Sequence, residues 1–403
     1  MKGGRNISKL DWEYLADPAK MAAKDTDMAR KSSVESDTPS AARRKSPALI
    51  QSRAGDIRVG PILAIPAVLD ELGVDPQRAF AQAKVSLRLF RDPDSRMGLA
   101  AAGRLFQISA DLTECPHFAL LVGNRFELKG LGLLGDLMRH SPSVGDALRS
   151  LLLHLHLHDR GAAPLLLAPD RQTAILGYSV YRHGTPATEY IYDVAIAIGN
   201  RIMLGLCGSD FRPAAVQFSY RRPNRTAAYR RVFGVDATFD AEVSGIVFAS
   251  SWLSNPIAGA DPKVHCAISA LIRDAQATGP LNLGEQVELV LHQLLLSGQA
   301  KADAVSKLFG ISERTLRRRL GEEGRSLQNL VKTTRFELAR QLLRNTRLPV
   351  AEIAAALHYA DANAFSRAFR NWAKSSPSQW RANSAPDCRP EQATKPELGI
   401  HVD

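Results

Sequence analysis

Cysteine is scarce in this 403-residue chain, which has four cysteines in all. Cys115, Cys207, Cys266 and Cys388 lie far apart, and no CxxC pair occurs. This spacing excludes a disulfide-stapled scaffold and a cysteine-rich zinc site, and it is typical of a protein from a reducing compartment. We therefore expect a cytoplasmic protein.

Long apolar runs are missing as well. No stretch approaches the ~18 consecutive apolar residues of a membrane helix, and residues 1–20 lack the apolar core of about 7–15 residues found in a signal peptide. We expect no membrane partner. The P-loop, GxSxG and HExxH motifs are also absent. The sequence thus predicts no catalytic residues, no metal site and no cofactor, and we expect a protein that is not an enzyme.

The excess positive charge is concentrated near the C-terminus. The chain has 52 basic and 41 acidic residues, a net charge of +11. Residues 295–383 alone hold 16 basic and 7 acidic residues, which is +9, and the rest of the chain carries only +2. A basic module joined to a near-neutral body predicts binding to a polyanion such as nucleic acid. A basic face that is merely solvated is the alternative.

Composition and periodicity divide the chain into five parts. The middle part mixes helical spacing with strand-like runs, among them a β-hairpin at 164–181, and this predicts an α+β fold. The part after it has only helical spacing. We expect a disordered leader at 1–55, an effector-binding or dimerisation domain at 56–262, a linker helix region at 263–282, an all-α domain at 283–383 and a disordered tail at 384–403.

Two helix pairs in the all-α part have helix-turn-helix spacing. In the first pair, Gly310 ends one helix and Ser312 caps the next, SERTLRRRLGEEG. In the second pair, Pro349 opens VAEIAAALHYA, and Asp361 caps ANAFSRAFRNWAK. A longer helix at 327–343 separates the pairs. Asn282 and Glu285 resemble a capping box that opens the domain. We expect two helix-turn-helix units joined by one long helix.

The second helix of each unit has a surface suited to DNA. At about 312–322, Leu316 and Leu320 face the core, so arginines 314, 317, 318 and 319 lie elsewhere on the helix. An Arg fork pairs with guanine O6 and N7 in the major groove. At about 361–373, Asn363 and Arg367 share an outward face, and Asn suits adenine.

The segment 283–383 resembles the DNA-binding domain of the AraC/XylS family. The resembling motifs are LFGISERTLRRRL, TRFELARQLL, PVAEIAAAL, ANAFSRAFRNW and SPSQWR. The resemblance implies a transcriptional regulator that inserts two recognition helices into adjacent major grooves of double-stranded DNA, with RNA polymerase as a further partner. The predicted DNA-binding residues are Arg314, Thr315, Arg317, Arg318, Ala362, Asn363, Arg367 and Arg370.

The chain departs from the family pattern at three positions. Ser306 replaces a usual small Ala, and His358 and Lys374 replace frequent glycines. We expect His358 to adopt a helix C-cap conformation that costs more than it would for Gly. We also expect the first unit to carry most of the specificity.

Residues 61–256 resemble the N-terminal domain of one branch of this family, the arabinose-binding-like regulators. The resembling pieces are LGVDP, LGLLGDLMRHSPSVGDALRSL, YRRVFG and WLSNPI. The resemblance implies binding of a small-molecule effector, self-association as a homodimer, or both, and it does not imply arabinose.

One run of histidines in this domain suggests a metal site. In a strand, His154, His156 and His158 would share a face, whereas in a helix only His154 and His158 would pair. The run continues a helix that starts at Val144, so we favour the helical reading, with the histidines in polar or packing roles.

Three hypotheses for function follow. The leading one is a ligand-responsive, sequence-specific transcriptional regulator. The second is a constitutive dimeric DNA-binding regulator with no small-molecule effector. The third is an enzyme fused to a DNA-binding domain, with the histidine run as its metal centre, and the lack of an acid, base or nucleophile set disfavours it.

Overall fold

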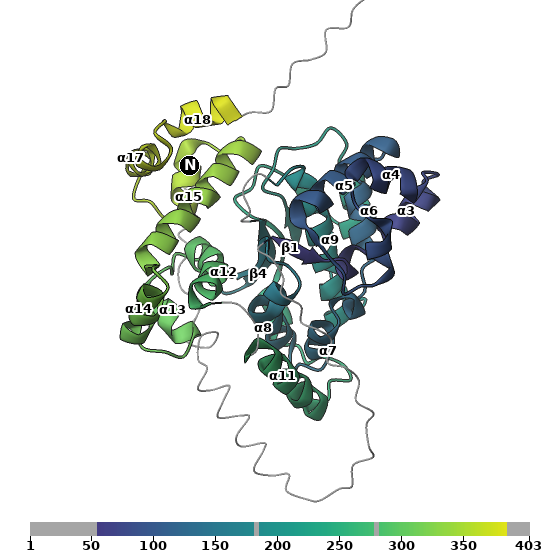
Figure 1. The fold of residues 1–403 in the computed structure, drawn as a ribbon, viewed down its shortest axis with the longest axis horizontal. Helices are drawn as coiled ribbons and strands as arrows, with labels where there is room; N and C mark the ends of the chain where they lie inside the picture. The colour runs from purple at the N-terminus through teal and green to yellow at the C-terminus, as the bar shows by residue number, and fades with distance from the viewer. Residues whose placement is uncertain (1–54, 181–184, 278–281, 385–403) are drawn as a thin grey trace, which may run out of the picture.

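The computed structural model describes residues 55–180, 185–277 and 282–384. Within these ranges an α+β N-terminal domain and an all-helical C-terminal domain lie side by side (Figure 1). Apart from Gly55 and Ser384, the predicted leader and tail lie outside the described residues.

Short helices make up the first part of the N-terminal domain, and a small two-stranded antiparallel sheet, β1–β2, lies among them. Asp75 and Ser143 cap α4 and α8, because their side chains accept hydrogen bonds from Gln77 N and Asp146 N. The elements are β1 (Asp56–Arg58), η1 (Gly60–Ile62), α3 (Ile65–Glu71), α4 (Pro76–Ala83), η2 (Leu87–Arg91), β2 (Arg96–Gly98), α5 (Leu99–Leu112), α6 (Phe118–Asn124), η3 (Leu128–Leu131), α7 (Leu133–Arg139), α8 (Val144–His154) and η4 (Leu155–Leu157).

A five-stranded sheet forms the centre of the molecule, with strand order β3-β4-β7-β5-β6. The predicted hairpin is confirmed as the antiparallel pair β3–β4, in which Leu165 lies opposite Gly177. The remaining elements of this domain are β3 (Ala162–Leu167), β4 (Thr173–Val180), α9 (Thr188–Cys207), β5 (Ala215–Gln217), α10 (Ala227–Phe233), β6 (Ala237–Thr238), β7 (Ser244–Ala249), η5 (Ser250–Ser254) and α11 (Pro262–Ala277).

Both faces of this sheet are covered. Leu176 and Ile246 pack into the main core of the N-terminal domain together with α9. Leu165, Leu167 and Val243 pack instead against leucines of the C-terminal domain. Burial on both faces explains why the β3 sequence AAPLLL is apolar throughout rather than alternating.

The helix α9 is long and apolar enough to cross a membrane by length and composition alone. Most of that window is buried inside the protein, where α9 packs against α6 and the sheet. A core helix of a globular domain passes the same test, so α9 is explained by its place in this core.

A glycine pattern with dinucleotide-binding spacing, GxGxxG, occurs at 130–135. In the structure it begins within η3 and does not follow a strand, so the strand–turn–helix context of such a loop is absent there. Gly132 has a φ of +52°, and a Cβ on Gly135 would lie 2.0 Å from Leu128 O. These glycines allow the tight packing of η3 on α7.

The C-terminal domain is all-helical, as predicted. Two apolar clusters hold it together, one around the first three helices and one around the last three, and α15 contributes to both. The helices are α12 (Leu283–Leu296), α13 (Ala302–Leu308), α14 (Glu313–Glu322), α15 (Leu327–Asn345), α16 (Val350–Ala356), α17 (Ala362–Ala373) and α18 (Pro377–Ser384).

Candidate nucleic-acid interface

The first helix-turn-helix unit is α13, its turn and α14. Gly310 makes the turn with a φ of +61°, and Ser312 Oγ accepts a hydrogen bond from Thr315 N at 3.1 Å. Leu316 and Leu320 are buried against α12 and the start of α15. The orientation of α14 is therefore fixed by its leucines, as the sequence predicts.

The opposite side of α14 is basic and open to solvent. Arg314, Arg317, Arg318 and Arg319 are all exposed, and Thr315 is half-buried beside its cap. Arg318 forms an ion pair with Glu322, with 2.5 Å between Arg318 Nη1 and Glu322 Oε1. This pair lies within the predicted DNA-contacting surface, so Arg318 must exchange one anionic partner for another if it contacts DNA.

The second unit is α16, its turn and α17. Asp361 caps α17 by accepting a hydrogen bond from Ala364 N at 2.7 Å, and Phe365 and Phe369 are fully buried. The outward side presents three exposed side chains, Asn363, Arg367 and Arg370, while Ala362 is half-buried. The structure thus brings the predicted residues of each unit onto its outward surface.

His358 occupies the turn of the second unit in a left-handed conformation, with a φ of +56°. The expected C-cap conformation is therefore confirmed. The imidazole lies against Gly298, and His358 Nε2 is 3.3 Å from Leu296 O at the end of α12. Lys374 ends α17 in the same conformation, with a φ of +59°. Contact with α12 gives the His358 side chain a packing role that Gly could not supply.

The helix α15 holds the two units apart. It has 19 residues, which corresponds to about 28 Å, and α14 and α17 lie at opposite ends of it (Figure 1). Leu330 belongs to the core of the first unit, and Leu342 belongs to that of the second. Trp380 of α18 packs back on Phe369, and Arg340 of α15 stacks over the indole at 5.5 Å. The spacing of the units therefore rests on one continuous helix.

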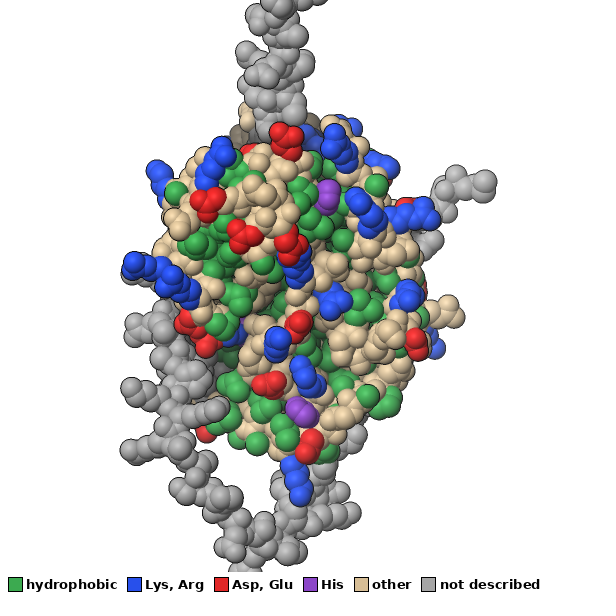
Figure 2. Space-filling view, turned by 90° about the vertical axis from the view of Figure 1, so that its right-hand side faces the viewer, with side chains coloured by type: hydrophobic (Ala, Val, Ile, Leu, Met, Phe, Trp, Pro, Cys, Tyr) green, Lys and Arg blue, Asp and Glu red, His purple; other side chains and the backbone are tan. Residues whose placement is uncertain are grey.

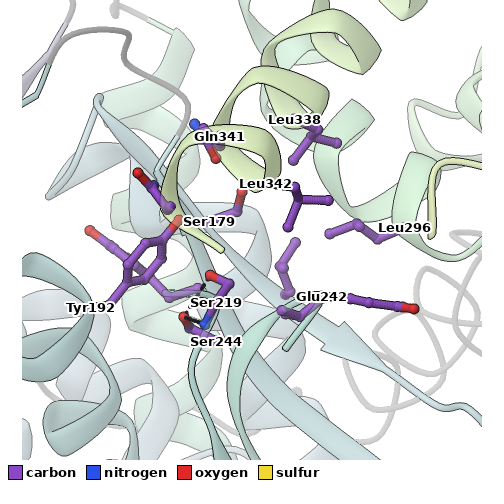
Figure 3. A pocket seen from close by; sticks show the side chains of 13 residues that line it. Ser179, Tyr192, Ser219, Glu242, Ser244, Leu296, Leu338, Gln341 and Leu342 are labelled. Atoms are coloured by element: carbon purple, nitrogen blue, oxygen red, sulfur yellow. Dashed lines mark hydrogen bonds between the residues drawn. The ribbon is translucent and has the colours of Figure 1, made fainter. Parts of the chain in front are cut away.

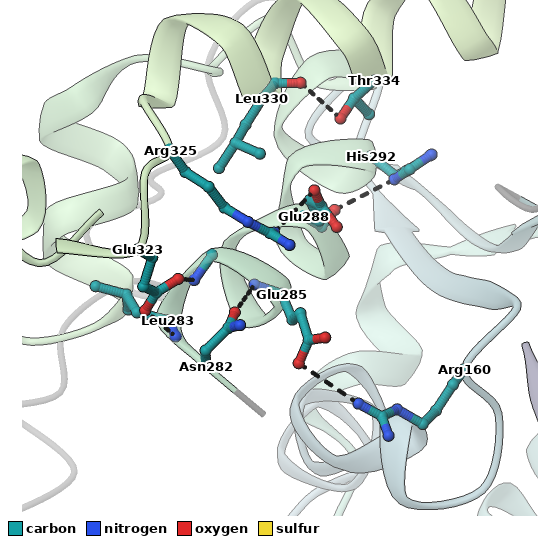
Figure 4. A network of polar contacts seen from close by, with 11 residues as sticks. Arg160, Asn282, Leu283, Glu285, Glu288, His292, Glu323, Arg325, Leu330 and Thr334 are labelled. Atoms are coloured by element: carbon teal, nitrogen blue, oxygen red, sulfur yellow. Dashed lines mark hydrogen bonds and ion pairs between the residues drawn. The ribbon is translucent and has the colours of Figure 1, made fainter. Parts of the chain in front are cut away.

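Polar contacts attach α12 to its surroundings (Figure 4). Asn282 caps α12 as predicted, by accepting a hydrogen bond from Glu285 N at 2.9 Å. The expected reciprocal contact of Glu285 in a capping box is wrong, because its carboxylate faces Arg160 of the N-terminal domain at 3.6 Å. The Glu323 carboxylate binds the helix end instead, and it accepts from Leu283 N at 2.9 Å and Gly284 N at 2.8 Å.

Burial and neighbouring charge shift the pKa values of two side chains of α12, Glu288 and His292. Glu288 pairs with Arg325 at 3.1 Å, and burial raises the pKa of Glu288, against the opposing effect of Arg325. His292 is buried one turn later, and its Nδ1 lies 3.3 Å from Glu288 O. Burial lowers the pKa of His292 to about 4, so its imidazole is neutral at physiological pH.

Hydrogen bonds also join the C-terminal domain to the sheet, and sequence reasoning missed them. The side-chain amide of Gln293 in α12 forms two hydrogen bonds with the backbone of Leu166 in the edge strand β3, one through its oxygen and one through its nitrogen. Gln341 of α15 donates to Val180 O, and Arg347 N donates to Asp240 Oδ1 at 2.7 Å. One signal was available, since Gln293 is a polar residue inside the apolar run LHQLLL.

The face of the molecule formed by the N-terminal domain carries charges of both signs (Figure 2). Figure 2 shows the face formed by the N-terminal domain, where Lys and Arg side chains are interspersed with Asp and Glu. The helices α14 and α17 lie on the other side of the molecule, away from α3 to α6 (Figure 1).

The histidine run follows the predicted helix only in part. His154 ends α8, His156 lies in η4 and His158 comes after it, with 6.5 Å between the ring centroids of His154 and His156. Burial lowers the pKa of His154 and His156 to about 4. Within residues 55–180, 185–277 and 282–384, no group of three or more His, Cys, Asp or Glu could hold a metal ion.

Two family models match the chain. The arabinose-binding domain of AraC transcription regulators, described as N-terminal, matches residues 73–257, and a helix-turn-helix domain matches residues 305–383.

Known regulators are similar over most of the chain. The HTH-type transcriptional regulator VirS of Mycobacterium tuberculosis is 26% identical over 330 residues, which cover 81% of this chain and 96% of that relative. The ornithine utilization regulator of Pseudomonas aeruginosa is 27% identical over 327 residues, which cover 80% and 96%. The solved structure of the transcriptional regulator CdpR from Pseudomonas aeruginosa aligns with a TM-score of 0.37 at 22% identity, covering 76% of this chain and 96% of that one.

Proposed function

Because the chain is a transcriptional regulator of the AraC/XylS family with an arabinose-binding-like N-terminal domain, we propose that it reads its operator with α14 and α17 in adjacent major grooves. Arg314, Arg317 and Arg318 contact bases from α14, with Thr315 beside them. Asn363 and Arg367 do so from α17, where Ala362 packs against the groove and Arg370 contacts a phosphate.

The observation that carries this proposal is the placement of the two exposed helices. The apolar sides of α14 and α17 are buried, and their Arg and Asn side chains face solvent. The helix α15, which is about 28 Å long, lies between them. Successive major grooves on one face of B-DNA are about 34 Å apart. A spacer of this length, with a recognition helix beside each end, suits that repeat.

We further propose that the N-terminal domain binds a small-molecule effector and a second copy of the chain. The α11 side chains Val264 and Leu271 are apolar and exposed, which favours self-association through this helix. RNA polymerase is the expected protein partner, and the cytoplasm is the expected compartment. No enzymatic reaction and no cofactor are assigned to the chain. A constitutive dimeric regulator without an effector is the second candidate.

Capture of fragmented genomic DNA by the purified full-length chain tests the proposal. We expect one enriched sequence motif, whose binding weakens steeply as salt rises because Lys and Arg displace counterions from phosphates. The absence of an enriched motif would contradict sequence-specific binding, and a binding constant independent of salt would contradict the electrostatic argument.

Substitution of one arginine separates base reading from general charge. Arg317→Ala should weaken operator binding by about 1–3 kcal/mol and relax the preference at one base pair. Arg88 is an exposed arginine of η2 in the N-terminal domain, so Arg88→Ala removes the same charge away from the proposed interface. An equal loss in both variants would remove α14 as the reader.

A further inference from the structure

The two helix-turn-helix units differ in how their apolar cores are closed. Among the described residues, the core of the first unit is built only from the C-terminal domain, from α12 to the first half of α15. The core of the second unit also contains three buried side chains of the N-terminal domain, Leu165, Leu167 and Val243. The sheet therefore completes the packing of the second unit but not that of the first.

These side chains of the sheet meet the helices that carry the second unit. Leu165 of β3 and Val243, directly before β7, line one small pocket together with leucines of α12 and α15 (Figure 3). Those leucines are Leu296, Leu338 and Leu342. Leu342 belongs to the same buried cluster as Phe365 and Phe369 of α17. Apolar packing is therefore continuous from the sheet to the buried side of the second recognition helix.

A hydrogen bond from the N-terminal domain fixes the turn that leads into the second unit. Arg347 lies between α15 and α16, and its backbone N donates to Asp240 Oδ1 at 2.7 Å. Asp240 is held in turn by its own domain, because Asp240 N donates to Tyr220 O at 2.9 Å. From the other side, Arg381 of α18 donates to Leu348 O at 2.5 Å. The start of α16 is thus held between α18 and the N-terminal domain.

The first unit has no such attachment. The described hydrogen bonds and ion pairs between the domains end on Glu285, Gln293, Gln341 and Arg347 in the C-terminal domain. Within residues 55–180, 185–277 and 282–384, none of them ends on α13 or α14. Glu285 and Gln293 attach α12, which packs in the cores of both units, whereas Gln341 and Arg347 lie beside the second unit.

We propose that the N-terminal domain positions the second recognition helix through Asp240 and the leucines of the sheet, while α14 reads its half of the operator independently of that contact. The inference rests on the proposed function, because it states which half of the DNA reading the N-terminal domain controls. Anything that binds one placement of the Asp240 loop better than another then changes the affinity for the α17 half of the operator.

Two substitutions of Asp240 separate its hydrogen bond from its backbone conformation. Asp240 has a φ of +56°, a left-handed conformation that Gly and Asn also adopt readily. Asp240→Gly therefore removes the acceptor for Arg347 N without straining the backbone. Asp240→Asn keeps an oxygen acceptor in the same place and removes only the charge, so it serves as the rescue variant.

The test measures the Kd of the full-length proteins for the operator captured from genomic DNA and for copies with one base pair changed. The α14 half is defined by the base pairs whose change no longer matters in Arg317→Ala, and the α17 half by those that no longer matter in Arg367→Ala. A changed base pair should raise the Kd of the wild type by roughly 5- to 150-fold.

Asp240→Gly should reduce this ratio by about twofold or more in the α17 half and leave it unchanged in the α14 half. Asp240→Asn should retain the wild-type ratio in both halves. Each ratio compares two DNAs bound by the same protein, so a smaller folded fraction does not alter it. The readout therefore separates positioning of α17 from a general loss of stability.

Amide hydrogen exchange of the DNA-free full chain gives a second measurement. In Asp240→Gly, exchange should become faster in α16 and α17, because the turn before them has lost a hydrogen bond. Exchange in α13 and α14 should remain as in the wild type, and Asp240→Asn should match the wild type throughout.

The outcomes separate this inference from the proposed function. Wild-type ratios in both halves for Asp240→Gly, or an equal reduction in both, would overturn the inference, as would exchange that becomes equally fast in α14 and α17. A wild-type protein that discriminates no base pair in either half would count against the proposed function itself, and the exchange measurement would still decide whether Asp240 positions α17.

Discussion

Gln293 of α12 and Leu166 of β3 are joined by two hydrogen bonds across the domain boundary. Leu166 N donates to Gln293 Oε1 at 2.8 Å, and Gln293 Nε2 donates to Leu166 O at 2.5 Å. The side-chain amide thus pairs with an edge strand as a neighbouring strand would. Because Gln293 is buried, the pair holds the first helix of the DNA-binding domain in a fixed position on the sheet.

Gln293→Ala should weaken the coupling between the domains. The substitution leaves the Leu166 N–H and C=O without this partner in a buried place, which costs about 1–3 kcal/mol of unfolding free energy. Urea unfolding, with the domains followed separately, measures the loss. Gln328 is an exposed glutamine of α15, and Gln328→Ala should leave stability nearly unchanged. Equal stability of the two variants would show that the pair contributes little.

Glu322→Ala should strengthen DNA binding. The substitution frees Arg318 from its ion pair, and an exposed pair of this kind is worth up to ~1 kcal/mol, so we expect operator affinity to rise by about two- to fivefold. Glu313 is an exposed carboxylate of the same helix with no ion pair described, and Glu313→Ala is the matched control for charge. If the gain in operator affinity is no larger than that of Glu313→Ala, breaking the Arg318–Glu322 ion pair does not strengthen DNA binding.

Ser306→Ala should stabilise the first helix-turn-helix unit. Ser306 is buried in α13, and its hydroxyl oxygen has no hydrogen-bond partner within the described chain. Removing an unpaired buried hydroxyl and introducing the best helix former should add roughly 1 kcal/mol to the unfolding free energy. By contrast, Ser297 Oγ donates to Leu294 O, so Ser297→Ala should destabilise the domain. A loss of stability in Ser306→Ala would refute the expectation.

Asp193→Asn should change the pH dependence of stability. Asp193 is buried in α9 and accepts hydrogen bonds from the hydroxyls of Tyr220 and Tyr229, and burial raises its pKa to about 7. The unfolded chain has a carboxyl pKa of about 3.9, so the folded state binds the extra proton between these values. This group therefore costs the native protein up to about 1.4 kcal/mol of stability per pH unit as the pH rises from about 4 to 7.

The Asn variant lacks this contribution. Relative to wild type it should gain stability steadily as the pH rises toward 7, and the difference should become constant above pH 7. Urea unfolding of both proteins from pH 5 to pH 8 measures the difference. A difference that does not vary with pH would show that Asp193 keeps an ordinary pKa in the folded protein.

Features that depend on neighbouring residues, such as helix caps, turns and the buried side of a helix, could be predicted from the sequence. Helix caps such as Asn282, Ser312 and Asp361 depend on one side chain and the next few backbone N–H groups, and all three bind as predicted. The positive φ of His358 was also foreseen, because the turn requires a left-handed residue at that place. The burial of Phe365 on α17 follows from helical spacing alone.

Contacts between residues far apart in the chain could not be predicted from the sequence. Gln293 and its partner Leu166 are 127 residues apart, and no local pattern connects them. Glu323 likewise takes the role at the start of α12 that local spacing assigned to Glu285. The strands of β1, β2 and β6 are too short to leave a periodic signal.

The central claim is that α14 and α17 occupy two successive major grooves on one face of the operator. Protection of guanine N7 from methylation by the bound full-length protein tests it most directly, because N7 lies in the major groove. We expect two protected patches about 10–10.5 base pairs apart, with one lost in Arg317→Ala and the other lost in Arg367→Ala. Protection of a single patch, or patches unaffected by both substitutions, would contradict the account.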